Sequence, residues 1–223
     1  MKGRIIVFEG TDASGKATQA KMLFERIRKA GKRVEFGSFP RYSEFFGSLV
    51  GRYLSGEFGS KEELPAEFCS LLYSLDRYHA KKEIEAKLKK GIILVFDRYF
   101  TANYGFQPAK FKQEKQRNEF FEWMKAVESR MPQPSIVFFL DVPIQLSQKL
   151  MKGKDRSKQY RKGKTKDIHE IDSSYQKRVR EMFLFLCKKE KNWVRINCVK
   201  GNKLRSREEI HKEISGKAGK ILK

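Results

Sequence analysis

Short apolar runs alternate along the chain with longer segments in which apolar residues recur at helical spacing. The first run, residues 4–9, precedes a glycine-rich loop, and residues 17–30 then carry apolar side chains at helical spacing until Gly31. A longer helix is predicted from Pro65 to residue 90, because Pro suits a first turn and charged pairs four residues apart support a helix. Further strands are predicted at residues 33–38, 92–97, 135–141 and 193–198.

This order of strands and helices predicts an α/β fold. Alternating strands and helices favour a parallel sheet with right-handed crossovers, so we expect five parallel strands with helices on both faces. The length of 223 residues suits a single domain over residues 1–223. Ligands of such sheets bind beyond the carboxyl ends of the strands, where the glycine-rich loop and Asp97 would meet.

Two segments lack the apolar pattern of the rest. Residues 151–170 hold eight Lys and Arg against three Asp and Glu, which predicts a short basic lid or, alternatively, a flexible solvated loop. The basic C-terminal tail, residues 215–223, is expected to be frayed.

Composition excludes several classes of protein. Hydrophobic residues make up 39% and aromatic residues 13% of the chain, which excludes a disordered protein. No apolar run approaches the roughly 20 residues that a membrane helix needs. The N-terminus has no recognisable export signal, so a cytoplasmic location is expected. Three cysteines without a CxxC spacing argue against a disulfide framework or a zinc site.

The charge of the chain widens the choice of partners. Lys and Arg number 49 and Asp and Glu number 27, a net charge of +22, and such a field attracts polyanions. Nucleic acids and phosphorylated small molecules both fit this charge, and lysines scattered over every helix would give it without either function. The charge alone therefore does not choose a partner.

A phosphate-binding loop is predicted in EGTDASGKATQ, residues 9–19. The Gly-x4-Gly-Lys spacing falls on Gly10, Gly15 and Lys16, directly between a predicted strand and a predicted helix. Glycines let backbone N–H groups turn toward a phosphate, the helix N-terminus adds a positive end, and the lysine follows the transferred phosphoryl group. The alternative is a glycine turn with a surface lysine. The candidate ATP-binding residues are Gly10, Thr11, Asp12, Ala13, Ser14, Gly15, Lys16, Ala17 and Thr18.

The order of several motifs resembles that of thymidylate kinases. From residue 5 to about residue 186, the chain carries GTDASGKATQ, FPRY, YLSGEFG, LLYSLDRYHA, DRYFTANYGFQ, FFLDVP and KDIHE in the family's order. It looks most similar to the bacterial branch with a GKAT loop and a KDIHE lid segment. The resemblance implies the three-layer fold of P-loop nucleoside monophosphate kinases with a short basic lid. It also implies transfer of the γ-phosphoryl group of ATP to dTMP, usually by a homodimer.

Two alternatives to dTMP phosphorylation stay open on the sequence. One is a P-loop kinase for another deoxynucleoside monophosphate such as dUMP. The other is a basic nucleic-acid-binding protein. Such a protein is expected to carry aromatic residues interleaved with Lys and Arg along a groove. Because the loop and the candidate arginines cluster instead around strand ends, we expect ATP and dTMP as ligands, no specific nucleic acid and no membrane.

The resemblance assigns the acceptor nucleotide to the long helix and to segments that follow strands. Tyr73 and Arg77 share a helix face; in the family an aromatic residue at the first position stacks on thymine and Arg at the second hydrogen-bonds the base. Relatives more often have Phe at position 73, and the alternative is a core tyrosine with a surface arginine. Phe106 stands where many relatives have Tyr near the sugar. The candidate substrate-binding residues are Phe39, Arg41, Tyr73, Arg77, Arg98, Tyr99, Asn103 and Gln107.

The resemblance places a catalytic cation in the basic lid. Asp12 matches an acidic residue that approaches the acceptor or the metal in relatives, whereas Ala13 stands where one branch has Arg. The other branch supplies this charge from the lid, which points to Arg156 or Arg161 without ranking them. His169 is given a structural role, because an ionised acceptor phosphate needs no general base. The candidate catalytic residues are Lys16, Asp12, Arg98, Arg156 and Arg161.

Mg2+ bound with ATP is the expected cofactor, although the loop is unusual at the position that normally binds it. Ala17 stands where such loops have a Ser or Thr hydroxyl. Either ATP oxygens, water, Asp97 and Asp12 hold the ion, or Thr18 reaches it by local unwinding. The first arrangement is chemically easier because Mg2+ keeps several waters, and Asp97 then binds it directly or through water. The alternatives for Asp97 are that it orients an arginine or that it is a surface residue at a strand end.

Overall fold

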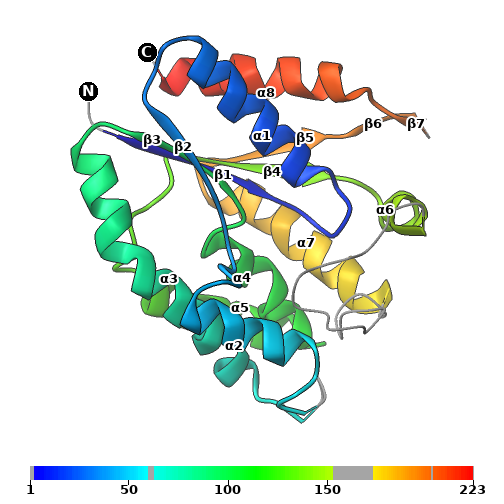
Figure 1. Ribbon diagram of the computed structural model, residues 1–223. Helices are drawn as coiled ribbons and strands as arrows, with labels where there is room; N and C mark the ends of the chain where they lie inside the picture. Colours follow the sequence, from blue (N-terminus) through cyan, green and yellow to red (C-terminus); the bar gives the residue numbers. More distant parts are fainter. Residues whose placement is uncertain (1–2, 60–62, 153–172, 202, 223) are drawn as a thin grey trace.

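A five-stranded parallel sheet forms the centre of the protein (Figure 1). The computed structural model describes residues 3–59, 63–152, 173–201 and 203–222. The strand order is β2-β3-β1-β4-β5 and every neighbouring pair is parallel, which confirms the predicted fold class. The strands are β1 Arg4–Glu9, β2 Val34–Ser38, β3 Ile93–Asp97, β4 Ile136–Asp141 and β5 Trp193–Asn197.

The central strands are buried on both faces because apolar side chains occupy both sets of alternating positions. In β1, Ile5 and Val7 belong to the core cluster on one face of the sheet. Ile6 and Phe8 belong to the cluster on the other face. A strand covered on both sides has no solvent face for polar residues, which explains the continuous apolar run in the sequence.

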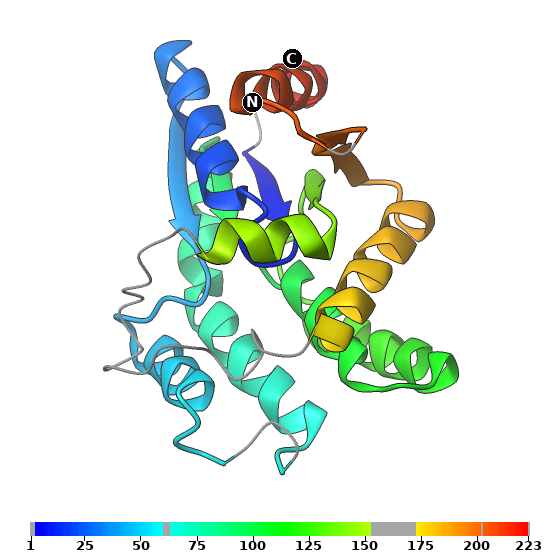
Figure 2. The same cartoon turned by 90° about the vertical axis from the view of Figure 1, so that its right-hand side faces the viewer.

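Helices cover both faces of the sheet, in agreement with the three predicted layers (Figures 1 and 2). The helices on one face are α1 (Lys16–Lys29) and α8 (Arg207–Ile221). Those on the other face are α3 (Ala66–Lys89), α4 (Thr101–Phe106), α5 (Glu114–Glu128) and α7 (Ser173–Lys189). The remaining elements are α2 (Phe45–Leu54), η1 (Pro108–Lys110), α6 (Ile144–Lys152) and a hairpin of β6 (Val199–Lys200) with β7 (Lys203–Leu204). Within the described ranges no helix is both long enough and apolar enough to cross a bilayer.

The apolar pattern does not predict α2, which packs against α3. Tyr53 is fully buried in a small cluster with Leu72 of α3. Gly47 and Gly51 weaken the intrinsic helical preference of this segment. A Cβ at Gly47, however, would lie 1.9 Å from the Arg41 carbonyl oxygen, so the glycine is needed for close approach. Tertiary packing therefore decides this helix.

A buried carboxylate at the end of β4 fixes α7 and β5 near the carboxyl end of the sheet. Asp141 is 1% exposed and accepts hydrogen bonds from Arg180 Nε at 2.6 Å and from Arg195 Nε at 2.8 Å. Two guanidinium groups compensate the buried charge, which would otherwise be strongly destabilising. Since α7 also contributes to the pocket described below, this contact helps to position the site.

Residues 215–221 of the C-terminal tail belong to α8, which corrects the expectation that this segment is frayed. Ile214, Ala218 and Leu222 are 0%, 1% and 7% exposed and belong to the same core cluster as α1. They are four residues apart and so share one helix face. The glycines and lysines between them hide this spacing in the sequence.

Ile214→Ala should lower the free energy of unfolding by about 3 kcal/mol, because it removes a fully buried side chain and leaves a cavity. Lys212→Ala, at an exposed position of the same helix, should change it by less than about 0.5 kcal/mol. Urea denaturation measures both values. A loss for Ile214→Ala as small as that for Lys212→Ala would show that α8 does not pack on the sheet.

Candidate active site

The loop between β1 and α1 has the backbone conformation of a phosphate cradle. Gly10 (φ 152°) and Gly15 (φ 89°) occupy regions that favour glycine. A Cβ at Gly10 would lie 2.8 Å from Ser14 Oγ and 2.9 Å from the Leu140 carbonyl oxygen, so no side chain fits there. Ala13 (φ 59°) is also left-handed, which costs a residue with a side chain about 1–2 kcal/mol. The loop ends at the N-terminus of α1, where N–H groups and the helix dipole favour an anion.

Lys16 is buried against this loop. Its Nζ donates a hydrogen bond to the Thr11 carbonyl oxygen at 2.7 Å and lies 3.5 Å from Ser14 Oγ. Burial lowers the pKa of Lys16, and the nearby Arg98 guanidinium lowers it further. An anion in the loop would oppose both effects, so the lysine is placed to bind a phosphate.

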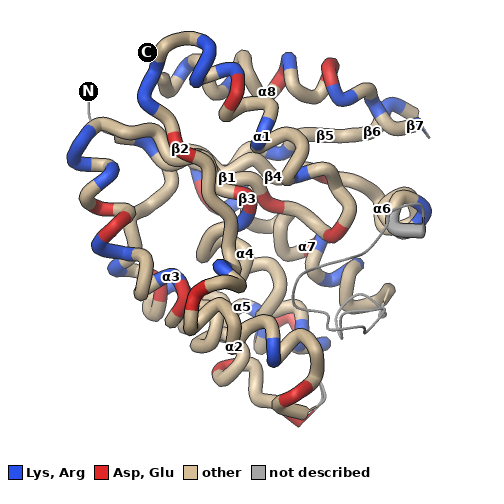
Figure 3. Tube along the Cα trace, in the orientation of Figure 1, with Lys and Arg blue, Asp and Glu red and all other residues tan. Residues whose placement is uncertain are grey.

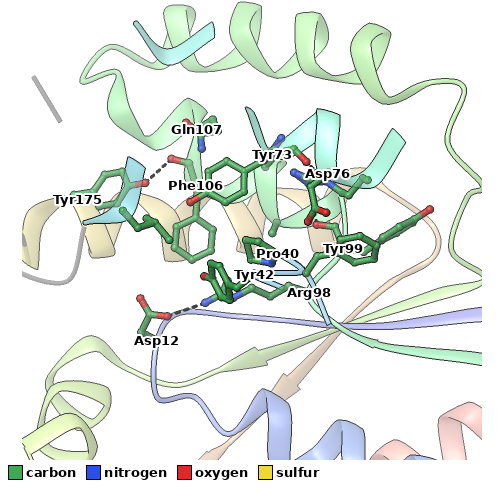
Figure 4. A pocket seen from close by; sticks show the side chains of 15 residues that line it. Asp12, Pro40, Tyr42, Tyr73, Asp76, Arg98, Tyr99, Phe106, Gln107 and Tyr175 are labelled. Atoms are coloured by element: carbon green, nitrogen blue, oxygen red, sulfur yellow. Dashed lines mark hydrogen bonds and ion pairs between the residues drawn. The ribbon is translucent and has the colours of Figure 1, made fainter. Parts of the chain in front are cut away.

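Arg98 connects the loop with a neighbouring pocket (Figure 4). Its NH2 donates to Asp12 Oδ1 at 2.8 Å, and its NH1 donates to the Gly10 carbonyl oxygen at 3.4 Å. The guanidinium lies 4.7 Å from the centre of the Phe106 ring. Burial acts to lower the pKa of Arg98, but Asp12 and the buried Glu9 more than offset it, so the pKa is raised. A permanent positive charge therefore stands between the loop and the pocket.

The pocket lies beside Arg98 and is bounded by side chains from α2, α3, α4 and α7 (Figure 4). Aromatic rings with a few polar and charged groups line it, a composition typical of small-molecule sites. On α4, a Cβ at Gly105 would lie 2.4 Å from the Phe183 ring of α7, so the two helices approach closely. The lining residues are Asp12, Phe39, Pro40, Tyr42, Leu54, Tyr73, Asp76, Arg77, Arg98, Tyr99, Ala102, Asn103, Phe106, Gln107 and Tyr175.

Tyr73 and Arg77 lie together on the wall that α3 contributes. The Arg77 guanidinium lies 5.8 Å from the centre of the Tyr73 ring, and its Nε donates to the Tyr73 carbonyl oxygen at 3.1 Å. Its NH1 donates to the Tyr99 carbonyl oxygen at 3.4 Å. Its NH2 has no hydrogen-bond partner in the described part of the chain. The buried NH2 group of Arg77 therefore has an unused hydrogen-bond donor beside the pocket.

Comparison with known proteins identifies the family of this site. Residues 8–214 match the family model described as thymidylate kinase. The chain belongs to the thymidylate kinase family. It is 30% identical over 214 residues to the thymidylate kinase of Homo sapiens, in an alignment that covers 96% of this chain and 88% of the human protein. It is 36% identical over 156 residues to the probable thymidylate kinase of Pyrococcus horikoshii, covering 68% of this chain and 71% of that protein.

A solved structure of the thymidylate kinase of Candida albicans has the same fold. It superposes with a TM-score of 0.73 at 23% sequence identity, over 99% of this chain and 91% of the other. The fold class and the thymidylate kinase family predicted from the motifs are thus confirmed. The bacterial-type branch stays a prediction.

Arg41 is the predicted acceptor-binding residue that the structure places outside the pocket. Its backbone N–H and its Nε donate to the Asp76 carboxylate at 2.8 Å and 3.1 Å, and its NH2 lies 3.1 Å from His79 Nδ1. These contacts hold its guanidinium against α3, and its role in acceptor binding stays a prediction. The other candidates come together in the pocket: Phe39, Tyr73, Arg77, Arg98, Tyr99, Asn103 and Gln107.

The residues expected to bind Mg2+ fit an ion that keeps much of its water. Asp97 Oδ1 is buried without a hydrogen-bond partner among the described residues, whereas Asp12 Oδ1 accepts from Arg98. Ala17 offers no hydroxyl, and Thr18 lies within α1, so local unwinding is not observed. No three His, Cys, Asp or Glu side chains in the described ranges group closely enough to hold a metal ion. Phosphate oxygens and water would therefore complete the shell of an ion held here.

The candidate lid residues Arg156, Arg161 and His169 lie outside the described residues. The roles assigned to these three residues therefore stay predictions. The described chain resumes with α7, whose residue Tyr175 lines the pocket.

Glu9 is a buried carboxyl group that the sequence reasoning misses. Its Oε1 accepts hydrogen bonds from the Tyr99 N–H at 3.1 Å and from Thr101 Oγ1 at 2.6 Å. These bonds tie the end of β1 to the turn that carries Arg98. Burial raises the pKa of Glu9 to about 7, against the opposing effect of Arg98. The available signal was a charged residue that ends an apolar run directly before the glycine loop.

The stability of Glu9→Gln relative to the wild type should increase with pH. Because the pKa of Glu9 is raised in the folded state, its ionisation between the ordinary value of 4.5 and about 7 destabilises the folded protein. Gln does not ionise, so the variant escapes this loss. Urea denaturation at about pH 5 and about pH 8 measures the gap between the two proteins. Glu119→Gln, at a 64% exposed side chain, should show no such trend. A gap for Glu9→Gln that stays constant with pH would contradict the prediction.

Proposed function

We propose that this protein transfers the γ-phosphoryl group of ATP to dTMP and forms ADP and dTDP. The observation that carries the proposal is the 2.8 Å contact between Arg98 and Asp12, because it joins a phosphate loop to a pocket lined by aromatic and polar side chains. Membership of the thymidylate kinase family supports dTMP over other acceptors.

Positioning and charge account for the proposed reaction. The loop and Lys16 bind the phosphates of ATP, and the pocket binds dTMP with its phosphate near Arg98. Lys16 and Arg98 then stabilise the negative charge that spreads over the oxygens of the transferred group. Asp12 positions Arg98 and receives no proton, because the acceptor phosphate is already ionised. The pocket side chains hold the acceptor in line, which supplies the entropic part of catalysis.

We propose that Mg2+ binds together with ATP near Asp97 and Asp12, directly or through water. The unpartnered Asp97 Oδ1 supports this ligand. When bound, the ion neutralises charge on the phosphate oxygens. Because Ala17 supplies no ligand, these carboxylates are the protein's contribution.

We further propose that the lid supplies a cation from Arg156 or Arg161, as in the bacterial-type branch that the sequence resembles. Ala13 supports this, because the loop has no arginine at the position where the other branch carries one. Single alanine variants separate the two residues. Replacement of the catalytic arginine should lower kcat at saturating substrate. If both variants keep the wild-type kcat, neither lid arginine is catalytic.

The high positive charge does not require a nucleic-acid partner. Lys and Arg residues are spread over α1, α3, α7 and α8, with acidic residues among them (Figure 3). A nucleic-acid-binding protein would instead favour a basic stripe along one groove. The charge is therefore better explained as a solvated basic surface around a site for phosphorylated ligands.

The decisive assay measures ADP formation with ATP and a panel of dTMP, dUMP, UMP, dCMP and dAMP. We expect the highest kcat/KM with dTMP and no turnover when EDTA removes Mg2+. Lys16→Ala should lower kcat/KM by about 100-fold or more, because it removes charge stabilisation from the transition state. Lys212→Ala, an exposed lysine on α8, is the matched control and should keep the wild-type rate. Turnover with another acceptor but none with dTMP would overturn the substrate, and an active Lys16→Ala would overturn the site.

We also propose a cytoplasmic homodimer that associates through α3. Phe68, Leu71 and Leu75 are 41%, 44% and 44% exposed. Their spacing of three and four residues makes one apolar stripe, and such patches mark association surfaces. Sedimentation equilibrium should give twice the monomer mass for the wild type and the monomer mass for Leu71→Glu. Lys82→Glu, at an exposed polar position of the same helix, should stay dimeric. A monomeric wild type would refute the dimer.

A further inference from the structure

A buried polar cluster lies next to the nucleoside pocket, around Glu128 at the end of α5. Glu128 is 0% exposed and does not itself line the pocket. Its Oε1 accepts hydrogen bonds from Ser74 Oγ at 2.7 Å and from Asn103 Nδ2 at 3.3 Å, and lies 3.9 Å from Arg77 NH1. Asn103 and Arg77 both line the pocket, so this carboxyl group touches two residues that a bound base would meet.

These contacts fix the orientation of the Asn103 amide. Its Nδ2 donates to the Ser70 carbonyl oxygen at 3.3 Å as well as to Glu128 Oε1 at 3.3 Å, so both of its hydrogens are used. A carbonyl oxygen and a carboxylate can only accept. If the amide turned over, its oxygen would face two acceptors and two hydrogen bonds would be lost. The group that Asn103 leaves for the pocket is therefore Oδ1, an acceptor.

The pocket thus combines an acceptor with a donor. The donor is Arg77 NH2, which has no hydrogen-bond partner among the described residues. Thymine and uracil present an N3–H donor beside a C4 carbonyl acceptor, whereas cytosine presents an N3 acceptor beside a C4 amino donor. The pair formed by Asn103 Oδ1 and Arg77 NH2 complements the first edge and opposes the second. A site built to hydrogen-bond one edge rejects a ligand that leaves its buried polar groups unpaired.

We propose that Glu128 is a positioning residue for base selection: it holds Asn103 with the amide oxygen toward the acceptor base. A pyrimidine with an N3–H group is then accepted and cytosine is rejected. This inference rests on the proposed function, since it concerns which nucleoside monophosphate the same pocket takes.

Glu128→Gln tests the proposal because it preserves the size of the side chain. The new amide can donate to Asn103 Oδ1 as well as accept from Nδ2, so only the Ser70 carbonyl oxygen still favours one orientation of the Asn103 amide. We expect kcat/KM for dTMP and dUMP to fall together by about tenfold, the value of one net hydrogen bond. The low kcat/KM for dCMP should not fall, so the ratio of dTMP to dCMP turnover should drop by about tenfold. Glu122→Gln, a carboxylate on the same helix that is 57% exposed, is the matched control and should leave all three values unchanged.

A proportional loss with all three acceptors, or an unchanged ratio of dTMP to dCMP, would overturn the proposal, because a purely structural role predicts no change in selectivity. A wild-type protein without dTMP turnover would instead overturn the proposed function, and this inference with it.

If Glu128→Gln does not fold, hydrogen exchange of the Asn103 side-chain amide in the wild-type protein tests the proposed orientation. The chain has five asparagines, so selective nitrogen-15 labelling of asparagine gives a simple spectrum in which dTMP addition should shift the Asn103 pair. Both Asn103 hydrogens should exchange with water more slowly than those of the exposed Asn197, before and after dTMP is added. Exchange as fast as that of Asn197 would overturn the proposed orientation.

Discussion

The site depends on the parallel register between β1 and β3. Phe8 pairs with Asp97, and the Phe8 carbonyl oxygen accepts a hydrogen bond from the Arg98 N–H at 3.1 Å. The phosphate loop follows one of these strands and Arg98 follows the other, so both leave the sheet at the same edge. A shift of register would separate Arg98 from Asp12 and with it the loop from the pocket. Apolar side chains on both faces of the central strands make such a shift costly.

Two groups of buried charges lie at the candidate site, one for each half of the proposed reaction. Near the loop, burial lowers the pKa of Lys16 and raises that of Glu9, so each group is more costly to ionise than in water. Beside the base, Arg77 and Glu128 are 2% and 0% exposed. The stability of the surrounding core offsets the cost of burying these charges. The charges are therefore already oriented before a ligand binds. The rest of the fold supplies the rigidity that keeps them in place.

The sequence predicts the parts of the fold that depend on local pattern. The five strands follow from apolar runs, and the loop follows from glycine spacing between a strand and a helix. The sequence fails where contacts between distant residues decide: α2 forms because it packs on α3, and Gly47 lets it approach the Arg41 backbone. Asp76 holds Arg41 from the long helix α3, and Glu128 reaches Asn103 from the end of another helix. No local pattern marks such contacts, and the resemblance to thymidylate kinases covers only positions that its motifs include.

The close approach of α4 to α7 at Gly105 links the acceptor pocket to the hydrophobic core. The ring of Phe183 occupies the space that a side chain at position 105 would need, and it is fully buried in the core cluster. The helix that carries Asn103 is thus positioned by Phe183, a residue that does not line the pocket. The position of this pocket wall therefore depends on the volume of a core side chain. A larger residue at position 105 can be accommodated only together with a smaller one at position 183. A substitution that reshapes this wall of the pocket therefore needs a compensating change in the core, at a residue that does not line the pocket.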